Sequence, residues 1–164
     1  MNLLQAATQK GRAAFTLIEM LIVIIILGIL AMVIIPQIGS SSDDAKLATL
    51  RTNLGTMRNA VELYYAQHNS VYPGVGGAAV FVQQLTLYTD VDGNSANSKT
   101  AIIKYGPYLK GGALGKNPFN DKNDATVDET QTDITVKTSG GNTGWKFFVK
   151  TGVLIANDGA HDSE

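Results

Sequence analysis

The chain has 164 residues, of which 45 % are apolar, and it carries a formal net charge of −1 with no cysteine. This length suits one globular unit with a small core. The lack of cysteine excludes a disulfide, a thiolate metal site and a thiol nucleophile. The near-neutral charge provides no broad electrostatic footprint for nucleic acid.

A long apolar run dominates the N-terminal part of the chain. It covers residues 15–35, and at about 1.5 Å per residue a helix of this length roughly matches a ~30 Å hydrocarbon core. A secretory signal peptide is the alternative, but its apolar region is typically only about 7 to 15 residues long. Lys10 and Arg12 precede the run, whereas two aspartates follow it before the first lysine, Lys46. The positive-inside tendency therefore predicts a cytoplasmic N-terminus and export of everything after Pro36.

One carboxylate, Glu19, lies inside the apolar run. A charged residue costs roughly 2.5 to 3.5 kcal/mol at the centre of a membrane span and less near its end, where Glu19 falls. One interpretation is a capping box, in which Thr16 caps the helix and Glu19 reaches back to the backbone N–H of Thr16. The other interpretation is that the carboxylate pairs with a cation, such as an α-amino group created by cleavage just before Phe15.

The motif at the start of this run resembles the class III signal of type IV pilin-like proteins. Residues 15–19 read Phe-Thr-Leu-Ile-Glu, follow a basic leader and open the long apolar helix. The resemblance implies that a prepilin peptidase removes residues 1–14 by cutting between Ala14 and Phe15. It also implies that the new amine of Phe15 is methylated, and that Glu19 meets the N-terminal amine of a neighbouring subunit during filament assembly.

Three further positions bear on this resemblance. Gly28 and Pro36 fall where the family usually has a glycine and a proline in the helix. Ala14, in contrast, stands where the family usually has glycine. Pro36 removes a backbone donor, so we expect a kink or local melting around residues 36–42. A linker that joins an anchor to a separate domain is the alternative interpretation.

The chain after Pro36 contains a second helical pattern. Apolar residues recur there at spacings of three and four: Leu47, Leu50, Leu54, Met57, Val61 and Tyr64. This stripe predicts an amphipathic helix over about residues 43–69, and the stripe needs a partner to cover it.

Shorter elements are expected downstream. Residues 78–88 fit a short helical face, although the alternation near residue 86 also permits a strand. Residues 133–138 alternate and predict a strand, and residues 145–149 and 153–156 predict a β-hairpin around a turn at 150–152. We expect this small antiparallel sheet to pack on the helix stripe and to form the core.

The downstream sequence also resembles the major pseudopilins of type II secretion. The similarity lies in Gly-Pro-Tyr-Leu at residues 106–109, Asn-Pro-Phe at 117–119 and Gly-Trp at 144–145. It implies an α+β, type IV pilin-like fold with three parts. These are a cleaved cytoplasmic leader (1–14), a transmembrane and filament-core helix (15–36), and a periplasmic head (37–164).

A calcium ion is the one cofactor that this resemblance suggests. Major pseudopilins commonly bind calcium in a C-terminal loop, where this chain offers Asn157, Asp158, His161 and Asp162. Calcium needs six to eight oxygen ligands, so a solvated acidic tail is the preferred interpretation and no cofactor is expected. Residues 90–94 resemble the opening of a calcium loop but lack its bidentate glutamate, and they predict a turn.

Catalytic motifs are missing from the sequence. The histidines, His68 and His161, have no activated nucleophile nearby in the sequence, and no glycine-rich phosphate loop is found. We therefore expect a structural protein and not an enzyme. A membrane-anchored periplasmic enzyme that uses one of these histidines is the alternative.

The resemblance to these families implies a structural subunit of a type II secretion pseudopilus. Its expected partners are further copies of itself, other pseudopilins or pilins, prepilin peptidase, the inner-membrane assembly platform and, before assembly, the lipid bilayer. Its expected location is the bacterial inner membrane as a single-pass protein, and then a periplasmic or surface filament. The alternatives are a type IV pilus subunit, or a minor or tip subunit that captures DNA or a surface through lysines 99, 104, 110 and 116.

Overall fold

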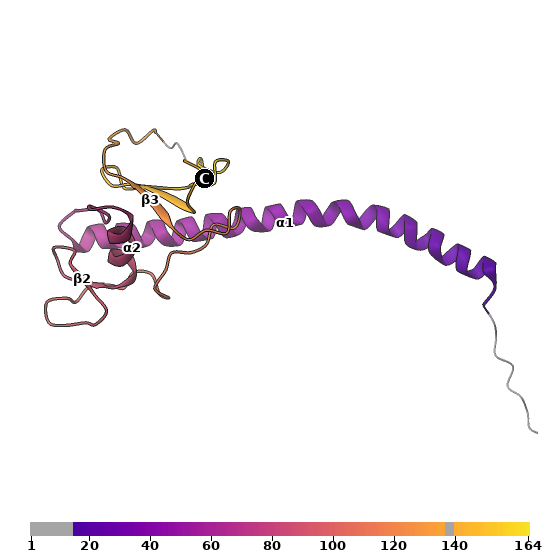
Figure 1. Cartoon of the computed structure of the whole chain (residues 1–164), viewed down its shortest axis with the longest axis horizontal. Coiled ribbons are helices and arrows are strands. Elements are labelled where there is room, and N and C mark those ends of the chain that lie inside the picture. The colour runs from indigo at the N-terminus through magenta and orange to yellow at the C-terminus, as the bar shows by residue number, and fades with distance from the viewer. Residues whose placement is uncertain (1–14, 137–139) are drawn as a thin grey trace, which may run out of the picture. The chain divides into compact units, whose positions relative to one another are not determined.

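The computed structural model describes residues 15–136 and 140–164, apart from the side chains of residues 33–41 (Figure 1). Two helices, α1 (Leu17–Gln67) and α2 (Ala78–Thr86), are followed by five short strands. The strands are β1 (Tyr88–Thr89), β2 (Ser95–Ala96), β3 (Ala125–Asp128), β4 (Trp145–Phe148) and β5 (Val153–Ala156). The chain divides into two compact units between Ser42 and Asp43.

Helix α1 continues through the position where a break was predicted. Its helical assignment includes Gly28 and Pro36 and runs on through residues 36–42. The predicted local melting there was therefore wrong, whereas the predicted kink and the linker alternative stay predictions. Proline removes a single backbone donor, and good helix formers such as Leu30 and Ala31 continue the helix up to it.

The first half of α1 displays its apolar side chains to the surroundings. The large apolar side chains from Leu17 to Met32 are 45–93 % exposed. A search of the described residues finds no helix with the length and apolar character needed to cross a membrane.

The second half of α1 supplies one wall of the core in residues 43–164. The predicted stripe is confirmed, since Leu50, Leu54, Met57, Val61 and Tyr64 are each at most 2 % exposed. Leu47 packs against the edge of the same cluster.

The three-stranded sheet packs against this stripe of α1. Its strand order is β3–β4–β5, and Trp145, Phe147 and Leu154 of the sheet belong to the same core cluster as Leu54. The predicted hairpin is confirmed, because β4 and β5 pair antiparallel with Phe148 opposite Val153.

The sheet is mixed, which corrects the prediction of an antiparallel one. Strand β3 pairs with β4 in parallel, with Ala125 opposite Trp145 and Asp128 opposite Phe148. A parallel pair needs a crossover of about a dozen residues or more, and residues 129–144 provide one. The packing direction of such a long connection is not visible in the local residue pattern.

The strand predicted over residues 133–138 was wrong for its described part. Ile134 and Thr135 lie in a turn, where the Asp133 carboxylate accepts hydrogen bonds from the backbone N–H and the hydroxyl of Thr135 at 2.8 and 2.7 Å. Side chain-to-backbone bonds of this kind compete with strand pairing. Residues 137 and 138 lie outside the described part of the chain.

The remaining local predictions agree with the structure. Helix α2 confirms the helical interpretation of residues 78–88, and β1 and β2 flank the turn predicted at residues 90–94. The Asp90 carboxylate holds that turn by accepting the backbone N–H groups of Asp92 and Asn94 at 3.0 and 2.9 Å. These hydrogen bonds, the one from the Asn94 side chain foremost, lower the pKa of Asp90 although burial opposes the shift.

Candidate functional site

The start of α1 forms a reciprocal capping box. The backbone N–H of Glu19 donates to Oγ1 of Thr16 at 3.3 Å, and the backbone N–H of Thr16 donates to Oε2 of Glu19 at 3.4 Å. The Thr16 hydroxyl adds a contact of 3.5 Å to the same carboxylate oxygen. The single chain therefore has the arrangement that the capping interpretation predicts.

This cap leaves the Glu19 carboxylate weakly held. Its bonds lie at the long end of the hydrogen-bond range, and they are exposed to solvent. Within the described residues, no basic side chain forms an ion pair with Glu19. The carboxylate is thus accessible to a cation from elsewhere.

Glu19 stands alone as a charge in a long apolar surface. It is the single ionisable residue between Phe15 and Asp43, and Phe15 itself is 72 % exposed. A helix that is apolar all round is typically buried in a membrane or among other helices. A charge at one end of such a helix needs a partner when the helix becomes buried.

Comparison with known proteins identifies the same segment. Residues 9–35 match the model of the prokaryotic N-terminal methylation motif. The chain carries this motif. Together with the arrangement of α1 and the small sheet, the motif makes the fold an α+β fold of the pilin-like kind.

Three curated relatives are similar to part of the chain, and each is named type II secretion system core protein G. The protein from Pseudomonas aeruginosa is 35 % identical over 65 residues, which are 40 % of this chain and 45 % of the relative. The protein from Vibrio cholerae is 36 % identical over 64 residues, or 39 % and 43 % of the two chains. The protein from Aeromonas hydrophila is 31 % identical over 65 residues, or 40 % and 45 %. The matched part thus spans less than half the length of these relatives, and no solved structure matches the chain.

The predicted processing residues remain predictions. Ala14 and the leader 1–14 lie outside the described residues, as does the side chain of Pro36. The position of a Cβ on Gly28 is open, with nothing within 4 Å, so packing within the chain does not require a glycine there.

Two of the candidate calcium ligands, Asn157 and Asp158, accept hydrogen bonds within the chain. Oδ1 of Asp158 accepts the backbone N–H groups of Ala160 and His161 at 2.9 and 3.0 Å. Its Oδ2 accepts Nδ2 of Asn117 at 2.8 Å, and Oδ1 of Asn157 accepts the backbone N–H of Gly141 at 3.2 Å. Burial raises the pKa of Asp158, but the hydrogen bonds outweigh it and the net shift is downward.

No metal-binding group of three or more His, Cys, Asp or Glu side chains is found in the described ranges 15–136 and 140–164. The prediction of no cofactor and its calcium alternative at Asn157, Asp158 and Asp162 both stay predictions. The acidic tail itself is not simply solvated, because Arg51 pairs with Glu164 at 2.6 Å and Arg58 donates to the main-chain oxygen of Glu164 at 2.6 Å.

Asn117 has a structural role that the sequence reasoning missed. It is fully buried, its Nδ2 donates to the carbonyl of Gly144 at 3.1 Å as well as to Asp158, and its Oδ1 accepts the backbone N–H of Phe119 at 2.9 Å. It joins the loop after β2, the start of β4 and the C-terminal tail. Asn117 begins the Asn-Pro-Phe motif of residues 117–119, and this motif is the sequence signal that could have pointed to its role.

The two histidines have separate structural roles. His68 is buried, stacks on Tyr64 with ring centroids 3.7 Å apart, and lies 3.0 Å from Oγ1 of Thr89. His161 stacks on Phe119 at 3.8 Å and lies 3.0 Å from Oδ1 of Asp158. Both arrangements hold structure together.

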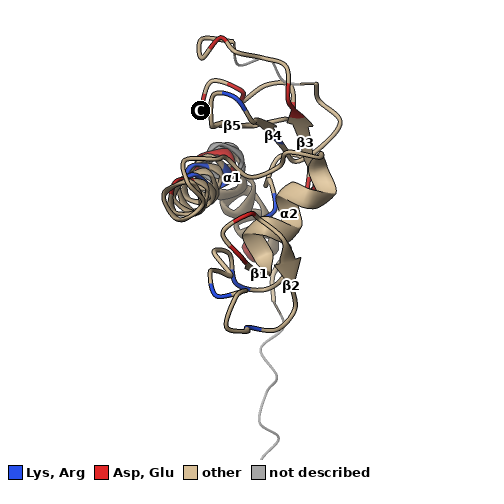
Figure 2. Ribbon diagram, turned by 90° about the vertical axis from the view of Figure 1, so that its left-hand side faces the viewer, with Lys and Arg blue, Asp and Glu red and all other residues tan. Residues whose placement is uncertain are grey.

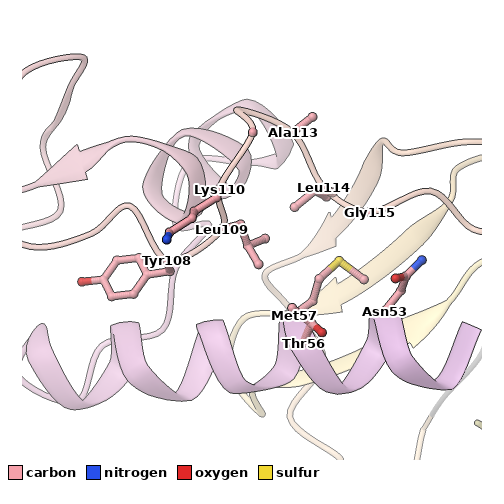
Figure 3. Close-up of a pocket in the computed structure, with 10 residues that line it drawn as sticks. Asn53, Thr56, Met57, Tyr108, Leu109, Lys110, Ala113, Leu114 and Gly115 are labelled. Carbon is pink, nitrogen blue, oxygen red and sulfur yellow. The ribbon is translucent and has the colours of Figure 1, made fainter. Parts of the chain in front are cut away.

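A cavity of about 630 Å³ lies between α1 and the loop of residues 108–115 (Figure 3). Met57, Leu109 and Leu114 give it an apolar floor, and Asn53 and Thr56 project from α1 along its edge. It contains one ionisable amine, from Lys110, and no carboxylate or histidine. Thr56 and Tyr108 add hydroxyl groups to this lining.

Proposed function

We propose that this chain is a structural subunit of a type II secretion pseudopilus and has no catalytic activity. The names of the three relatives support secretion over a type IV pilus. The observation that carries the proposal is the methylation motif on a helix whose apolar side chains, from Leu17 to Met32, are all solvent-exposed in the single chain.

An exposed apolar surface of this kind needs an apolar environment. Isolated soluble proteins rarely leave contiguous apolar patches larger than a few hundred Å² uncovered. A bilayer would cover the helix first, and equivalent helices of other copies would replace the lipid in a filament. The subunit then begins in the inner membrane with its N-terminus in the cytoplasm and ends in a periplasmic filament.

Processing sets up the transfer from lipid to filament. Prepilin peptidase would cut between Ala14 and Phe15 and methylate the new amine, which places a cation at the very start of α1. The Glu19 carboxylate, weakly capped in the single chain, would then pair with the Phe15 amine of a neighbouring copy. Two opposite charges can be buried together as a pair, whereas burial of one charge without its partner is strongly disfavoured.

The partners that follow are further copies of this chain, other pseudopilins, prepilin peptidase and the inner-membrane assembly platform. The Cβ position of Gly28 has nothing within 4 Å, and we propose that Gly28 and Pro36 serve the packing of helices in the filament. Calcium at Asn157, Asp158 and Asp162 is kept as a proposal that calcium-dependent unfolding of the full chain would test.

Mass spectrometry of the mature chain from its native cells tests the proposal directly. The expected chain begins at Phe15 with one methyl group on its amine, and electron microscopy shows filaments that contain it. A chain that keeps residues 1–14 and stays monomeric in the membrane would contradict the proposal.

A further inference from the structure

Two loops of residues 43–164 carry opposite charge. The basic loop, residues 97–110, contains Lys99, Lys104 and Lys110 and no acidic residue. The acidic loop, residues 128–135, contains Asp128, Glu129 and Asp133 and no basic residue. Their formal charges are therefore +3 and −3.

The two loops lie on opposite sides of α1. Figure 2 shows the β1–β2 side below the helix, with lysines in blue along its loops, and the β3–β5 sheet above it, with carboxylates in red on the loops beside β3. The three lysines form no ion pair among the described residues. One chain therefore cannot neutralise its own basic loop with its acidic loop.

Each loop also displays one isoleucine. Ile102 of the basic loop is 73 % exposed and Ile134 of the acidic loop is 64 % exposed. Among the described residues from 43 onward, these are the two most exposed large apolar side chains. An apolar centre with charged residues around it is the usual composition of a protein interface.

Short-range hydrogen bonds order the backbone of both loops beside the isoleucines. In the basic loop, Oγ1 of Thr100 accepts the backbone N–H groups of Ile102 and Ile103 at 3.3 and 3.0 Å. In the acidic loop, the Asp133 carboxylate accepts hydrogen bonds from the backbone N–H and the hydroxyl of Thr135, and Ile134 lies between these two residues in the chain. Pre-formed loops lose less conformational freedom on binding.

Hydrogen bonds lower the pKa of two carboxylates of the acidic loop, Asp128 and Asp133. Hydrogen bonds from Thr130 and Gln131 lower the pKa of Asp128, and Lys146 of β4 lowers it further, although burial opposes the shift. Hydrogen bonds from Thr135 lower the pKa of Asp133. Lys146, on the neighbouring strand, is the basic group that faces this loop from within the chain.

We propose that the basic loop of one copy docks on the acidic loop of the next copy, with Ile102 beside Ile134. The inference rests on the proposed filament and names the contact between its heads. Because the two surfaces differ and lie on opposite sides of the chain, a pair of docked copies leaves one basic loop and one acidic loop free. Such heterologous contacts do not close into a dimer but continue into a filament.

The contact is small and acts together with the packing of the N-terminal helices. Exposed ion pairs contribute little singly, but copies held together by their helices bring the loops to a high effective concentration. The contact therefore sets the register and rotation of neighbouring heads, and it weakens as salt rises.

Cysteine cross-linking in full-length chains tests the proposal, since the natural chain has no cysteine. The variants are Ile102→Cys, Ile134→Cys and the double variant, each produced in the native cells and treated with a short bis-maleimide. The double variant is expected to yield a ladder of cross-linked multimers, and either single variant is expected to remain at least tenfold less cross-linked. Cells that produce both single variants together are expected to yield dimers and no ladder.

Electron microscopy of the same samples separates this inference from the proposed function. Filaments without a ladder would overturn the loop contact and leave the filament role standing, whereas neither filaments nor a ladder would overturn both. Strong cross-linking in a single variant would replace the heterologous contact by a symmetric one and also overturn the inference.

Charge reversal provides a second test. In the double-cysteine background, Lys99→Glu with Lys104→Glu is expected to lower the cross-linking yield severalfold. The matched control is Lys46→Glu, a reversal on the exposed face of α1, which is expected to leave the yield unchanged. Equal effects from both changes would contradict a contact specific to the basic loop.

Discussion

The two halves of α1 are both rich in apolar residues, yet those residues end in opposite environments. From Leu17 to Met32 the large apolar side chains are 45–93 % exposed, whereas the stripe from Leu50 to Tyr64 is at most 2 % exposed. The difference lies in pattern and not in hydrophobicity. An apolar stripe on one face is covered by the chain's own sheet, while an apolar surface on every face must be covered by lipid or by other helices.

Charge follows the same division. The first half carries Glu19 alone, whereas Arg51, Arg58 and Glu62 line the polar face of the second half. Arg58 reaches over the hairpin and donates to the carbonyl of Leu154 at 2.8 and 3.1 Å. The second half is therefore packed within its own chain. The proposed function assigns the first half to contacts between molecules.

The largest effect is expected for a substitution of Glu19, which separates its capping role from its role as a charge partner. Glu19→Ala is expected to abolish filaments while leaving membrane insertion and cleavage intact, because the terminal amine of a neighbour would be buried without a partner. Immunoblotting of membrane and filament fractions measures this.

Thr16→Ala is the matched control for that experiment. It removes the other half of the capping box at a cost of about 1 kcal/mol in helix stability, and filaments are expected to persist. If Thr16→Ala and Glu19→Ala impair assembly equally, Glu19 acts as a cap and not as a charge partner.

A pair of identical substitutions compares the two halves directly. Leu54→Ala is expected to lower the free energy of unfolding of the head by about 2–5 kcal/mol, because Leu54 is 1 % exposed in the core. Leu21→Ala, in the exposed half, is expected to leave it unchanged. Urea unfolding of the full chain in detergent, followed by the fluorescence of the single and fully buried tryptophan, Trp145, measures both. Equal destabilisation would mean that the two halves share one core.

The hairpin turn supplies a smaller effect. Gly152 has φ +71°, and a Cβ there would lie 2.3 Å from the Tyr72 ring, so Gly152→Ala is expected to destabilise the head by about 1–3 kcal/mol through strain and steric overlap. Gly111 also has a positive φ but has nothing within 4 Å of its Cβ position. The same unfolding measurement on Gly111→Ala isolates the effect of backbone strain. An equal loss of stability in both variants would contradict a steric overlap with Tyr72.

The smallest expected effect concerns acid stability at Asp158, whose side chain is 5 % exposed. Its folded pKa is lowered, so its contribution is complete above the unfolded pKa of about 3.9 and is lost as pH falls through the lower folded pKa. Asp158→Asn is expected to cost about 1–2 kcal/mol at pH 7 and to flatten the pH dependence below about pH 4. Unfolding curves from pH 7 to 2 measure this, and parallel curves for both chains would contradict it.

Local patterns predicted local structure. The spacing of Leu50, Leu54 and Met57 predicted the buried stripe, and the turn after Phe148 predicted the hairpin. Residues 90–94 predicted a turn as an incomplete calcium loop, and Asp90 holds that turn. In each case the residues that decide the structure lie within a few positions of one another, so sequence reasoning was sufficient.

Two further misses arose where distant segments meet, whereas the wrong predictions at residues 36–42 and 133–138 have local causes. Thr126 and Val127 lie in a strand because β4 runs beside them, and nothing nearby in the sequence marks that pairing. Asn117 gains its role from Gly144 and Asp158. In the candidate site, the motif of residues 15–19 was recognisable from the sequence. Only the three-dimensional structure shows that the hydrogen bonds of the Thr16–Glu19 cap are long and exposed.

The sequence by itself determined which part of α1 is apolar all round and which part is amphipathic, because helical periodicity is a property of neighbouring residues. Only the tertiary structure decided that β3 joins the sheet in parallel, and that the loops of Ile102 and Ile134 lie on opposite sides of α1. Those outcomes depend on how long connections pack against the core, and that free energy is shared among residues far apart in the chain.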